Sequence, residues 1–527
     1  MTINNDDLNG IPEDPENGNG AAGGTGTQNT QPENKIIDMN SLAIEQVEFG
    51  EENQAASRAS KELPPNVTSK HLYKDILRIT WPSLVEMTLT QLASLVDQLM
   101  VASSAGGMNA VASVGLATMP RFILMSVFMS FSVGSMALVA RYKGMGEQKK
   151  ANLVLRQSVL LAAVTSALLI AAGLMSSQWM VDFMANSGSG AIDAATISDA
   201  NAYLRVQIWG LPTLAITSMI TASLRGVGNT RIAMVYNIIS NLVNIFFNYC
   251  FIYGNFGFPE WGVLGASVAT VIGQLAAAIM AVITVMSGKQ YLTLRIRDGF
   301  MPHAETLKSI FRIGFPALIE QMVMRIGNTL YNRTIATLGV IDLATHNIAL
   351  SIQSMSFTLG MAISSPATSL IGQSLGKRRS DMAQAYSYRC KRIGVVLSLA
   401  LSVIFFFFGG SIVGIFSDDP QVVEKGAFLL KICSFILPFQ SQQFITAGIL
   451  RGAGDTKSTA VIVAGTTLLL RPALASWFIN TVQTGLAGAW YAFAIDQLVR
   501  TLLVTLRFNS GKWKTAFQSS NLRNPEL

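Results

Sequence analysis

Charged residues are scarce in this sequence of 527 residues. They make up 13% of the chain, whereas hydrophobic residues make up 50% and the mean hydropathy is +0.40. A water-soluble chain of this length would not tolerate so few charges and so much apolar surface. The composition therefore excludes a soluble protein and predicts an all-α polytopic membrane protein.

Cysteine and histidine are also rare, with three of each. The cysteines are Cys250, Cys390 and Cys433, which have apolar neighbours and no CxxC spacing, so neither a disulfide framework nor a metal cage is indicated. The histidines are His71, His303 and His346, and we expect each to be an ordinary solvent-facing or interface residue. Without a His-Glu-x-x-His motif, a Ser/His pair or clustered acids, an intramembrane enzyme is disfavoured, and no cofactor is expected.

Long apolar runs are missing from the first 69 residues, which carry twelve acidic and three basic side chains. They are rich in Asn, Gly, Glu, Gln and Thr, and they lack the basic start and apolar core of a signal peptide. We expect residues 1–69 to form a disordered acidic cytoplasmic tail, and residues 511–527 a second, short cytoplasmic tail.

The rest of the chain contains twelve apolar segments that are long enough to span a membrane as helices. The expected spans are 75–101, 111–141, 153–176, 200–223, 232–254, 263–287, 308–338, 344–375, 392–416, 426–450, 458–480 and 485–508.

Basic and neutral links between these spans alternate. The links after the even-numbered spans carry basic residues, for example Lys149, Arg225, Arg295, Arg378 and Lys457, whereas the links after spans one, three, five, seven and eleven have none. The link after span nine has only Lys425. The positive-inside rule then places both termini in the cytoplasm of a multi-pass protein, in the plasma membrane or, in a Gram-negative bacterium, the inner membrane.

The second half of the chain repeats the first. RITWPSLVE at 78–86 returns as RIGFPALIE at 312–320, and SLRGVGNTR at 223–231 returns as ILRGAGDTK at 449–457. Such repeats in the same orientation predict two six-helix lobes, residues 70–290 and 291–510, related by a pseudo-two-fold axis along the membrane normal. Lobes of this kind usually enclose a central cavity that opens alternately to the two sides. We expect a monomer, with Arg225 and Arg451 anchoring tight cytoplasmic turns beside lipid headgroups.

Two carboxylates interrupt the first span. Glu86 and Asp97 are eleven residues apart, which is three helical turns, so both lie on one side of the helix with Thr90 and Ser94. A carboxylate inside a membrane is costly unless it is partnered. This polar stripe is typical of a helix that lines an ion or proton path. The alternative interpretation is that the two carboxylates make structural hydrogen bonds that fix helix packing.

The fifth span carries a second polar stripe. It consists of Asn237, Asn241, Asn244 and Asn248, which recur on one helical face, whereas their counterparts in span eleven are Val463, Thr467, Leu470 and Leu474. Amide oxygens beside a carboxylate suit a hard cation or a hydrogen-bonded water chain. We expect the first half to hold the ion-coupling site, with Na⁺ possible at Asp97, and the alternative is interhelical hydrogen bonding alone.

The second half has carboxylates with basic neighbours. Glu320 and Asp496 share their lobe with Arg325, Arg471 and Arg500, and Asp496 and Arg500 are spaced to meet on one helix. We expect these charges, including Arg325, to pair within the lobe, which would make it a poor cation site.

Methionines are frequent in the helices that are expected to face the midline. Met125, Met129, Met322 and Met355 are candidates for a substrate cavity because flexible thioethers fit varied apolar shapes. Lipid-facing or core methionine is the alternative interpretation.

Several of these features together resemble the multidrug and toxin extrusion (MATE) family over about residues 70–510. They are the repeated Pro-x-x-x-Glu (Pro82/Glu86 and Pro316/Glu320), the Asp-Gln-x-Met-Val-Ala sequence at Asp97 and the paired RGxGxT loops. The resemblance implies an antiporter that expels cationic amphipathic compounds in exchange for Na⁺ or H⁺, and it implies that Asp97 matches the family's first-helix acid. We expect gating or structural roles for Pro82, Glu86, Pro316 and Glu320.

The chain also departs from the family pattern. The position of Asn248 is often a second acid in similar MATE proteins, so a two-carboxylate site is in doubt here. The alternative function is a lipid-linked oligosaccharide flippase of the same superfamily, which would need a basic cavity and would use Arg325, Arg471 and Arg500.

Overall fold

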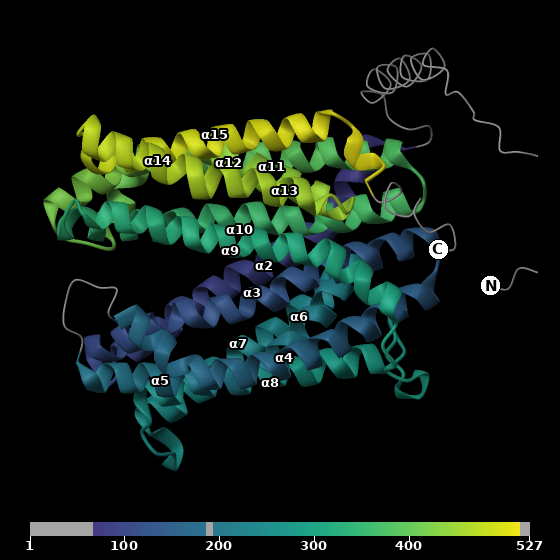
Figure 1. The fold of residues 1–527 in the computed structure, drawn as a ribbon, viewed down its shortest axis with the longest axis horizontal. Helices are drawn as coiled ribbons and strands as arrows, with labels where there is room; N and C mark the ends of the chain where they lie inside the picture. The colour runs from purple at the N-terminus through teal and green to yellow at the C-terminus, as the bar shows by residue number, and fades with distance from the viewer. Residues whose placement is uncertain (1–66, 186–192, 517–527) are drawn as a thin grey trace, which may run out of the picture. The chain divides into compact units, whose positions relative to one another are not determined.

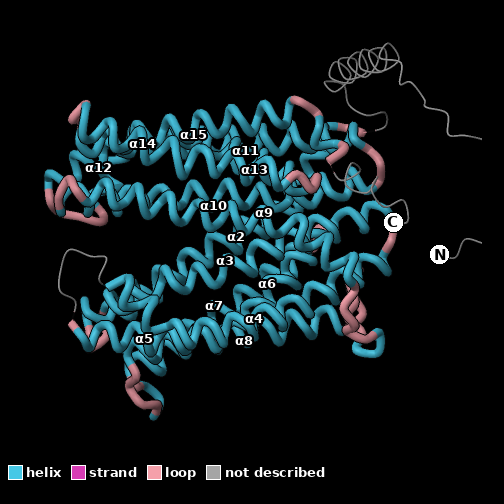
Figure 2. The backbone as a smooth tube through the Cα atoms, viewed as in Figure 1, coloured by secondary structure: helices cyan, strands magenta, loops and turns pink. Residues whose placement is uncertain are grey.

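The fold is known from a computed structural model that describes residues 67–185 and 193–516. Most of the expected acidic tail (1–69) and part of the expected C-terminal tail (511–527) lie outside the described residues. The described residues form helices joined by short loops, and they contain no strand (Figure 2). The predicted all-α class is confirmed.

The described residues of the first half form seven α-helices that account for six spans. They are α2 (Ser69–Ala102), α3 (Gly107–Met145), α4 (Gln148–Ala185), α5 (Ala194–Trp209), α6 (Leu211–Gly226), α7 (Thr230–Tyr253) and α8 (Gly262–Met286). The fourth span is divided at Gly210, two residues before Pro212, which has no N–H to donate. The sequence interpretation of 200–223 as one helix is therefore wrong in this detail.

The second half repeats the arrangement. It contains α9 (Ala304–Ala336), α10 (Val340–Gly376), α11 (Ser380–Gly414), α12 (Pro420–Gly452), α13 (Thr456–Val463), α14 (Arg471–Ser476) and α15 (Gly485–Asn509). Two π-helical segments, Ala464–Leu470 and Trp477–Thr481, join α13 and α14 into the eleventh span. Pro472 lies between these segments, where its missing N–H disturbs the regular hydrogen-bond ladder.

Within the described residues, seven of the helical spans are long and apolar enough to cross a membrane by composition alone. The other spans, α2, α5 with α6, α9, α12 and α15, are interrupted or carry polar and charged side chains in their interior. The residues that lower the hydropathy of α2 and α9 include the candidate site residues Glu86, Asp97 and Glu320.

The helices form two lobes. In Figure 1, α3 to α8 make up the lower layer and α10 to α15 the upper layer, with α2 and α9 between them. The first turns of α2 pack in the upper core, where Leu72 and Ile76 are fully buried against residues such as Tyr386. The first turns of α9 pack in the lower core through Ile310 and Ile313. Each lobe thus receives the start of the other lobe's first helix.

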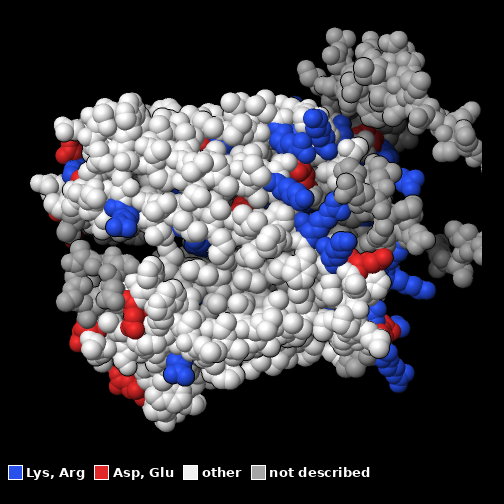
Figure 3. Space-filling view, viewed as in Figure 1, with Lys and Arg blue, Asp and Glu red and all other residues white. Residues whose placement is uncertain are grey.

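Basic side chains gather at one end of the molecule. Figure 3 shows Lys and Arg at the right-hand end, where the described chain also begins and ends, and it shows mostly acidic side chains at the opposite end. The lobes meet closely at the basic end, where Gly144 of α3 lies against the Gln373 backbone of α10 with no room for a side chain. The surface is hollowed between the lobes at the opposite end (Figure 3). The gathering of basic side chains at one end matches the predicted alternation of basic and neutral links.

Candidate ion-coupling site

The polar faces of α2 and α7 lie against each other. Asn237 donates to Glu86 at 2.6 Å, Asn241 to Thr90 at 3.5 Å, and Asn248 to Asp97 at 2.6 Å. Each pair is separated by 151 residues, so the two helices run in the same direction and keep one register over three turns. The structure therefore brings together the two stripes that were predicted separately.

Asp97 lies near the end of this register and is held by amides. The Asn248 amide donates to its Oδ1, and the Asn244 amide, with its nitrogen toward Asp97, donates to both carboxylate oxygens at 2.9 and 3.1 Å. In that orientation the Asn244 oxygen accepts from the Thr270 backbone N–H at 3.2 Å, so both ends of the amide are satisfied. Neutral amides leave the charge of Asp97 free to change on binding a cation or a proton.

One oxygen beside Asp97 has no partner within the described part of the chain. Asn248 is 1% exposed, and its Oδ1 accepts no hydrogen bond. A buried amide oxygen without a donor is costly, and ordered water or a bound ion usually satisfies such a group. This oxygen and the Asp97 carboxylate are the ligand types that Na⁺ or a protonated water would take. Groups of three or more His, Cys, Asp or Glu suited to a metal are absent from the described residues.

Arg121 of α3 also acts on Asp97. It is half-buried, and it is the basic residue whose positive charge influences this carboxylate, although no ion pair within 4.0 Å joins them among the described residues. Arg121 belongs to span two, so the sequences of spans one and five do not reveal that a basic residue acts on Asp97. The sequence does contain a signal for Arg121, because it is a charged residue directly after Pro120 in the interior of an apolar span.

Glu86 has a different environment from Asp97. It is 5% exposed, and Arg225 Nη2 donates to its Oε1 at 2.5 Å, beside the amide of Asn237. Arg225 belongs to the first RGxGxT loop, so the expectation that it anchors to lipid headgroups is wrong. The loop arginine instead neutralises an intramembrane acid.

The second half contains the equivalent ion pair. Glu320 is 2% exposed, accepts a hydrogen bond from Arg451 of the second RGxGxT loop, and accepts another from Thr459 at 3.1 Å. The same correction therefore applies to Arg451. Pro82 and Pro316 are buried inside α2 and α9, about one turn before these acids. The repeated Pro-x-x-x-Glu thus belongs to two matched ion pairs.

Asp496 lies at the centre of a buried charge network. Its side chain is 0% exposed and accepts from Arg500 at 2.7 Å and from Arg471 Nε at 2.9 Å. Arg471 also donates to Asn328 at 2.8 Å, and Arg500 donates to Thr466 at 3.0 Å. The predicted Asp496–Arg500 contact is confirmed, and the acids of this lobe are engaged by its arginines.

Arg325 does not follow that pattern. Its guanidinium lies over the ring of Phe122 in α3, 4.7 Å from the centroid, so it contacts the other lobe through a cation–π interaction. The expectation that Arg325 pairs within its own lobe is wrong. The face of the Phe122 ring attracts the Arg325 guanidinium, but it carries no negative charge that would neutralise it.

The candidate methionines differ in their exposure. Met125 and Met322 are half-buried, whereas Met129 and Met355 are 50% and 60% exposed. Their role in substrate binding stays a prediction.

His346 was expected to be an ordinary solvent or interface residue, and this is wrong. It is fully buried, accepts from the Trp490 indole at 3.2 Å, and lies 3.2 Å from Asn332 Oδ1.

Comparisons with known proteins agree with this architecture. The MatE family model matches residues 82–250 and 316–477, which together make up more than half of the chain. The chain is 28% identical over 468 residues to a probable multidrug resistance protein NorM of Thermotoga maritima, covering 89% of this chain and 98% of that protein. It is 26% identical over 439 residues to the uncharacterized transporter YisQ of Bacillus subtilis, covering 83% and 94%.

Solved structures show the same fold. A crystal structure of a MATE protein in the bent conformation has a TM-score of 0.77 at 21% identity, covering 85% of this chain and 97% of that one. A MOP superfamily transporter from Pyrococcus furiosus, described as having a binding pocket of reverse polarity, also gives 0.77 at 22% identity, covering 84% and 96%.

Proposed function

Because the chain belongs to the MATE family of multidrug efflux transporters, we propose that it is a secondary active antiporter that exports cationic amphipathic compounds in exchange for Na⁺ or H⁺. Its coupling site lies in the N-terminal lobe, residues 70–290, and the C-terminal lobe, residues 291–510, serves as its structural partner. The protein works as a monomer in the plasma membrane, or in the inner membrane of a Gram-negative bacterium, with both termini in the cytoplasm.

The observation that carries this proposal is the contrast between Asp97 and the other intramembrane acids. Glu86, Glu320 and Asp496 each accept hydrogen bonds from arginine, which fixes their charge. Asp97 accepts hydrogen bonds from asparagine amides. A coupling residue must gain and lose a positive partner in every cycle, and a carboxylate held by a permanent arginine cannot do so at low cost.

The surroundings of Asp97 support the exchange of one monovalent cation. Na⁺ would take the Asp97 oxygens and the unpartnered Asn248 Oδ1, whereas H⁺ would neutralise the carboxylate directly. In both cases the positive charge of Arg121 is part of the electrostatic surroundings of Asp97 when the ion has left. A cationic substrate and the ion then compete for the same negative charge, directly or through the conformation that opens outward.

The alternative of a lipid-linked oligosaccharide flippase gains no support. Arg471 and Arg500, two of the three arginines proposed for a basic cavity, are buried and bonded to Asp496.

The test is transport of a fluorescent organic cation by everted membrane vesicles from cells that express the protein, under separately imposed Na⁺ and H⁺ gradients. We expect one gradient to drive uptake into the vesicles, and Asp97→Asn to lower that rate at least about tenfold because it removes the exchangeable charge. Gln98→Ala, at an exposed neighbour on the same helix, is the matched control and should transport normally. Concentrative transport by a correctly inserted Asp97→Asn protein would show that the coupling site lies elsewhere.

A further inference from the structure

A small cavity lies at the basic end of the second lobe, away from the proposed coupling site. It has a volume of about 150 Å³ and is lined by residues of α10, α11 and the turn between them, namely Leu370, Gln373, Ser374, Lys377, Arg379, Met382 and Tyr386. Sites for drug-sized ligands usually measure about 300 to 1,000 Å³. This cavity is therefore too small for a transported amphiphile but large enough for a compact polar group.

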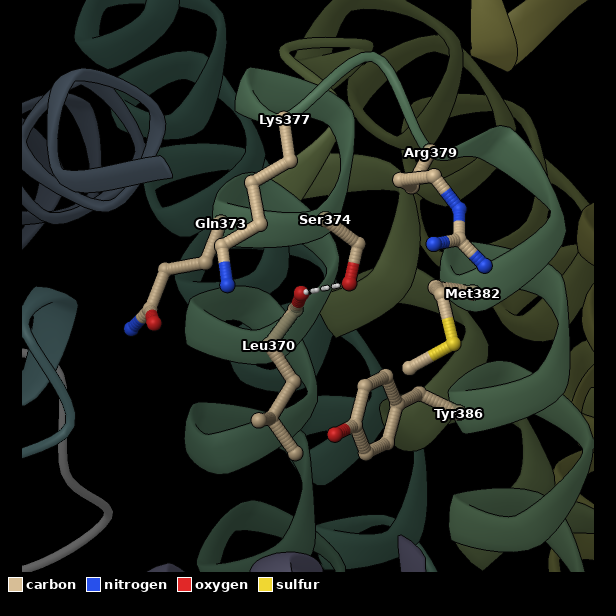
Figure 4. Close-up of a pocket in the computed structure, with 7 residues that line it drawn as sticks. All are labelled: Leu370, Gln373, Ser374, Lys377, Arg379, Met382 and Tyr386. Carbon is tan, nitrogen blue, oxygen red and sulfur yellow. Dashed lines mark hydrogen bonds between the residues drawn. The ribbon is translucent and has the colours of Figure 1, made fainter. Parts of the chain in front are cut away.

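Two cations flank the cavity. Figure 4 shows the Lys377 amine and the Arg379 guanidinium on opposite sides, both directed from the turn toward the polar and apolar walls formed by Gln373, Ser374 and Met382. Among the described residues, the Lys377 amine has no hydrogen-bond or ion-pair partner. The alternation of basic links explains why the turn is positive, but it does not explain a cavity between two of its cations.

Two carboxylates lie near the cavity, and one of them pairs with Arg379. Asp381 accepts a hydrogen bond from Arg379 at 2.6 Å, and this bond holds the pKa of Asp381 below its ordinary value. Asp75 of α2 is engaged by the Tyr386 hydroxyl at 2.9 Å. Lys143 of the other lobe adds a further positive charge, which is close enough to act on Lys377. An anion entering the cavity would therefore meet the unpaired Lys377 amine, whereas the Arg379 guanidinium already has a counter-charge in Asp381.

The backbone of the turn is unusual. Arg378 has φ of 57°, a left-handed conformation that favours glycine, and the corresponding turn after α3 places Gly146 in that conformation with φ of 79°. The arginine is therefore retained at a backbone cost. This conformation places Lys377 and Arg379 on either side of the cavity mouth.

From these features we propose that this cavity is a binding site for a phosphate group, carried either by an anionic lipid or by a soluble phosphate compound. Lys377 supplies a point charge, and the Gln373 amide is the neutral polar wall. Arg379 supplies the N–H donors of its Nη1, because its Nε and Nη2 donate to Asp381. Gln373 also donates to the Gly226 carbonyl of the other lobe at 2.9 Å. The ligand would therefore bind beside the contact between the lobes and stabilise the arrangement in which their basic ends meet.

The test measures the thermal unfolding midpoint of the full-length protein in uncharged detergent while inorganic phosphate is titrated against chloride at matched ionic strength. A second arm compares nanodiscs of phosphatidylglycerol with nanodiscs of phosphatidylcholine. We expect a saturable stabilisation in at least one arm, and the variant Lys377→Gln with Arg379→Gln should weaken the apparent affinity about tenfold or more. Stabilisation by both ligands identifies the phosphate group as the feature recognised, and stabilisation by phosphatidylglycerol alone identifies the lipid as its source.

Two control proteins make the result specific. Lys149→Gln with Lys150→Gln removes the same charge from the exposed first turn of α4, which follows the corresponding turn after α3, and should bind like the wild type. Lys377→Arg with Arg379→Lys keeps both charges and should retain most of the affinity. The proposal is overturned if neither ligand stabilises the wild type, or if the Lys377/Arg379 and Lys149/Lys150 variants respond alike.

Discussion

Removing the carboxylate of Asp496 should destabilise the second lobe severely. This side chain is fully buried and is the shared acceptor of Arg471 and Arg500, which are 6% and 1% exposed. In Asp496→Asn both guanidinium groups stay buried without a counter-charge, and the amide nitrogen faces two donors. Breaking a buried ion pair by removing one partner costs about 3 to 5 kcal/mol. The folding equilibrium should therefore shift by more than about a hundredfold.

The assay is the fraction of protein that stays monodisperse after heating in detergent, measured by size-exclusion chromatography. Asp298→Asn is the matched control, because Asp298 is 48% exposed and lies 3.8 Å from Arg156, and such surface pairs contribute about 0 to 1 kcal/mol. Replacing all three buried charges with Leu or Met should recover much of the lost stability, since no uncompensated charge remains. An Asp496→Asn protein as heat-resistant as the wild type but unable to transport would refute this reasoning and assign Asp496 to the coupling machinery.

Four further predictions concern other parts of the molecule. Glu320→Gln should lower heat resistance because it leaves the Arg451 guanidinium without its ion-pair partner, but vesicle transport should continue in the protein that folds. Asn244→Ala should weaken transport without abolishing it, measured as the initial rate at equal protein, since Asn248 still holds Asp97. Membrane-impermeant thiol reagents applied to intact cells should label Asp418→Cys and spare Arg378→Cys, and the reverse pattern would invert the topology. Deletion of residues 1–60 should leave the transport rate nearly unchanged, and a lost rate at normal expression would reveal a regulatory tail.

The repeat and the charge alternation predicted the fold well because both can be read directly from the sequence, without knowledge of how the helices pack. The separation of eleven residues placed Glu86 and Asp97 on one face of α2, and the i, i+4, i+7 and i+11 spacing placed the asparagines on one face of α7. Helical periodicity says which residues share a face, but it does not say which helix that face meets or in what register. The pairing of the two stripes at a constant separation of 151 residues therefore needed the structure.

The main errors of the sequence analysis concern the partners of the intramembrane acids, because these partners also depend on which helices meet. The loop position of Arg225 suggested lipid headgroups, but its guanidinium extends from the end of α6 to Glu86 of α2. Arg121 was missed because its influence on Asp97 depends on how α3 packs against α2. Sequence alone does predict that an intramembrane charge needs a partner. The partner's identity is a matter of tertiary packing.

The reciprocal burial of the first turns of α2 and α9 has a consequence for how this molecule arose. Leu72 and Ile76 complete the core of the second lobe, and Ile310 and Ile313 complete that of the first, so neither six-helix unit has a whole core by itself. An ancestral six-helix chain with this pattern would have filled its core only by exchanging helix ends with a second copy, as a domain-swapped dimer. In the present chain the exchange is intramolecular. Its folding therefore does not depend on the concentration of a partner, as the folding of such a dimer would.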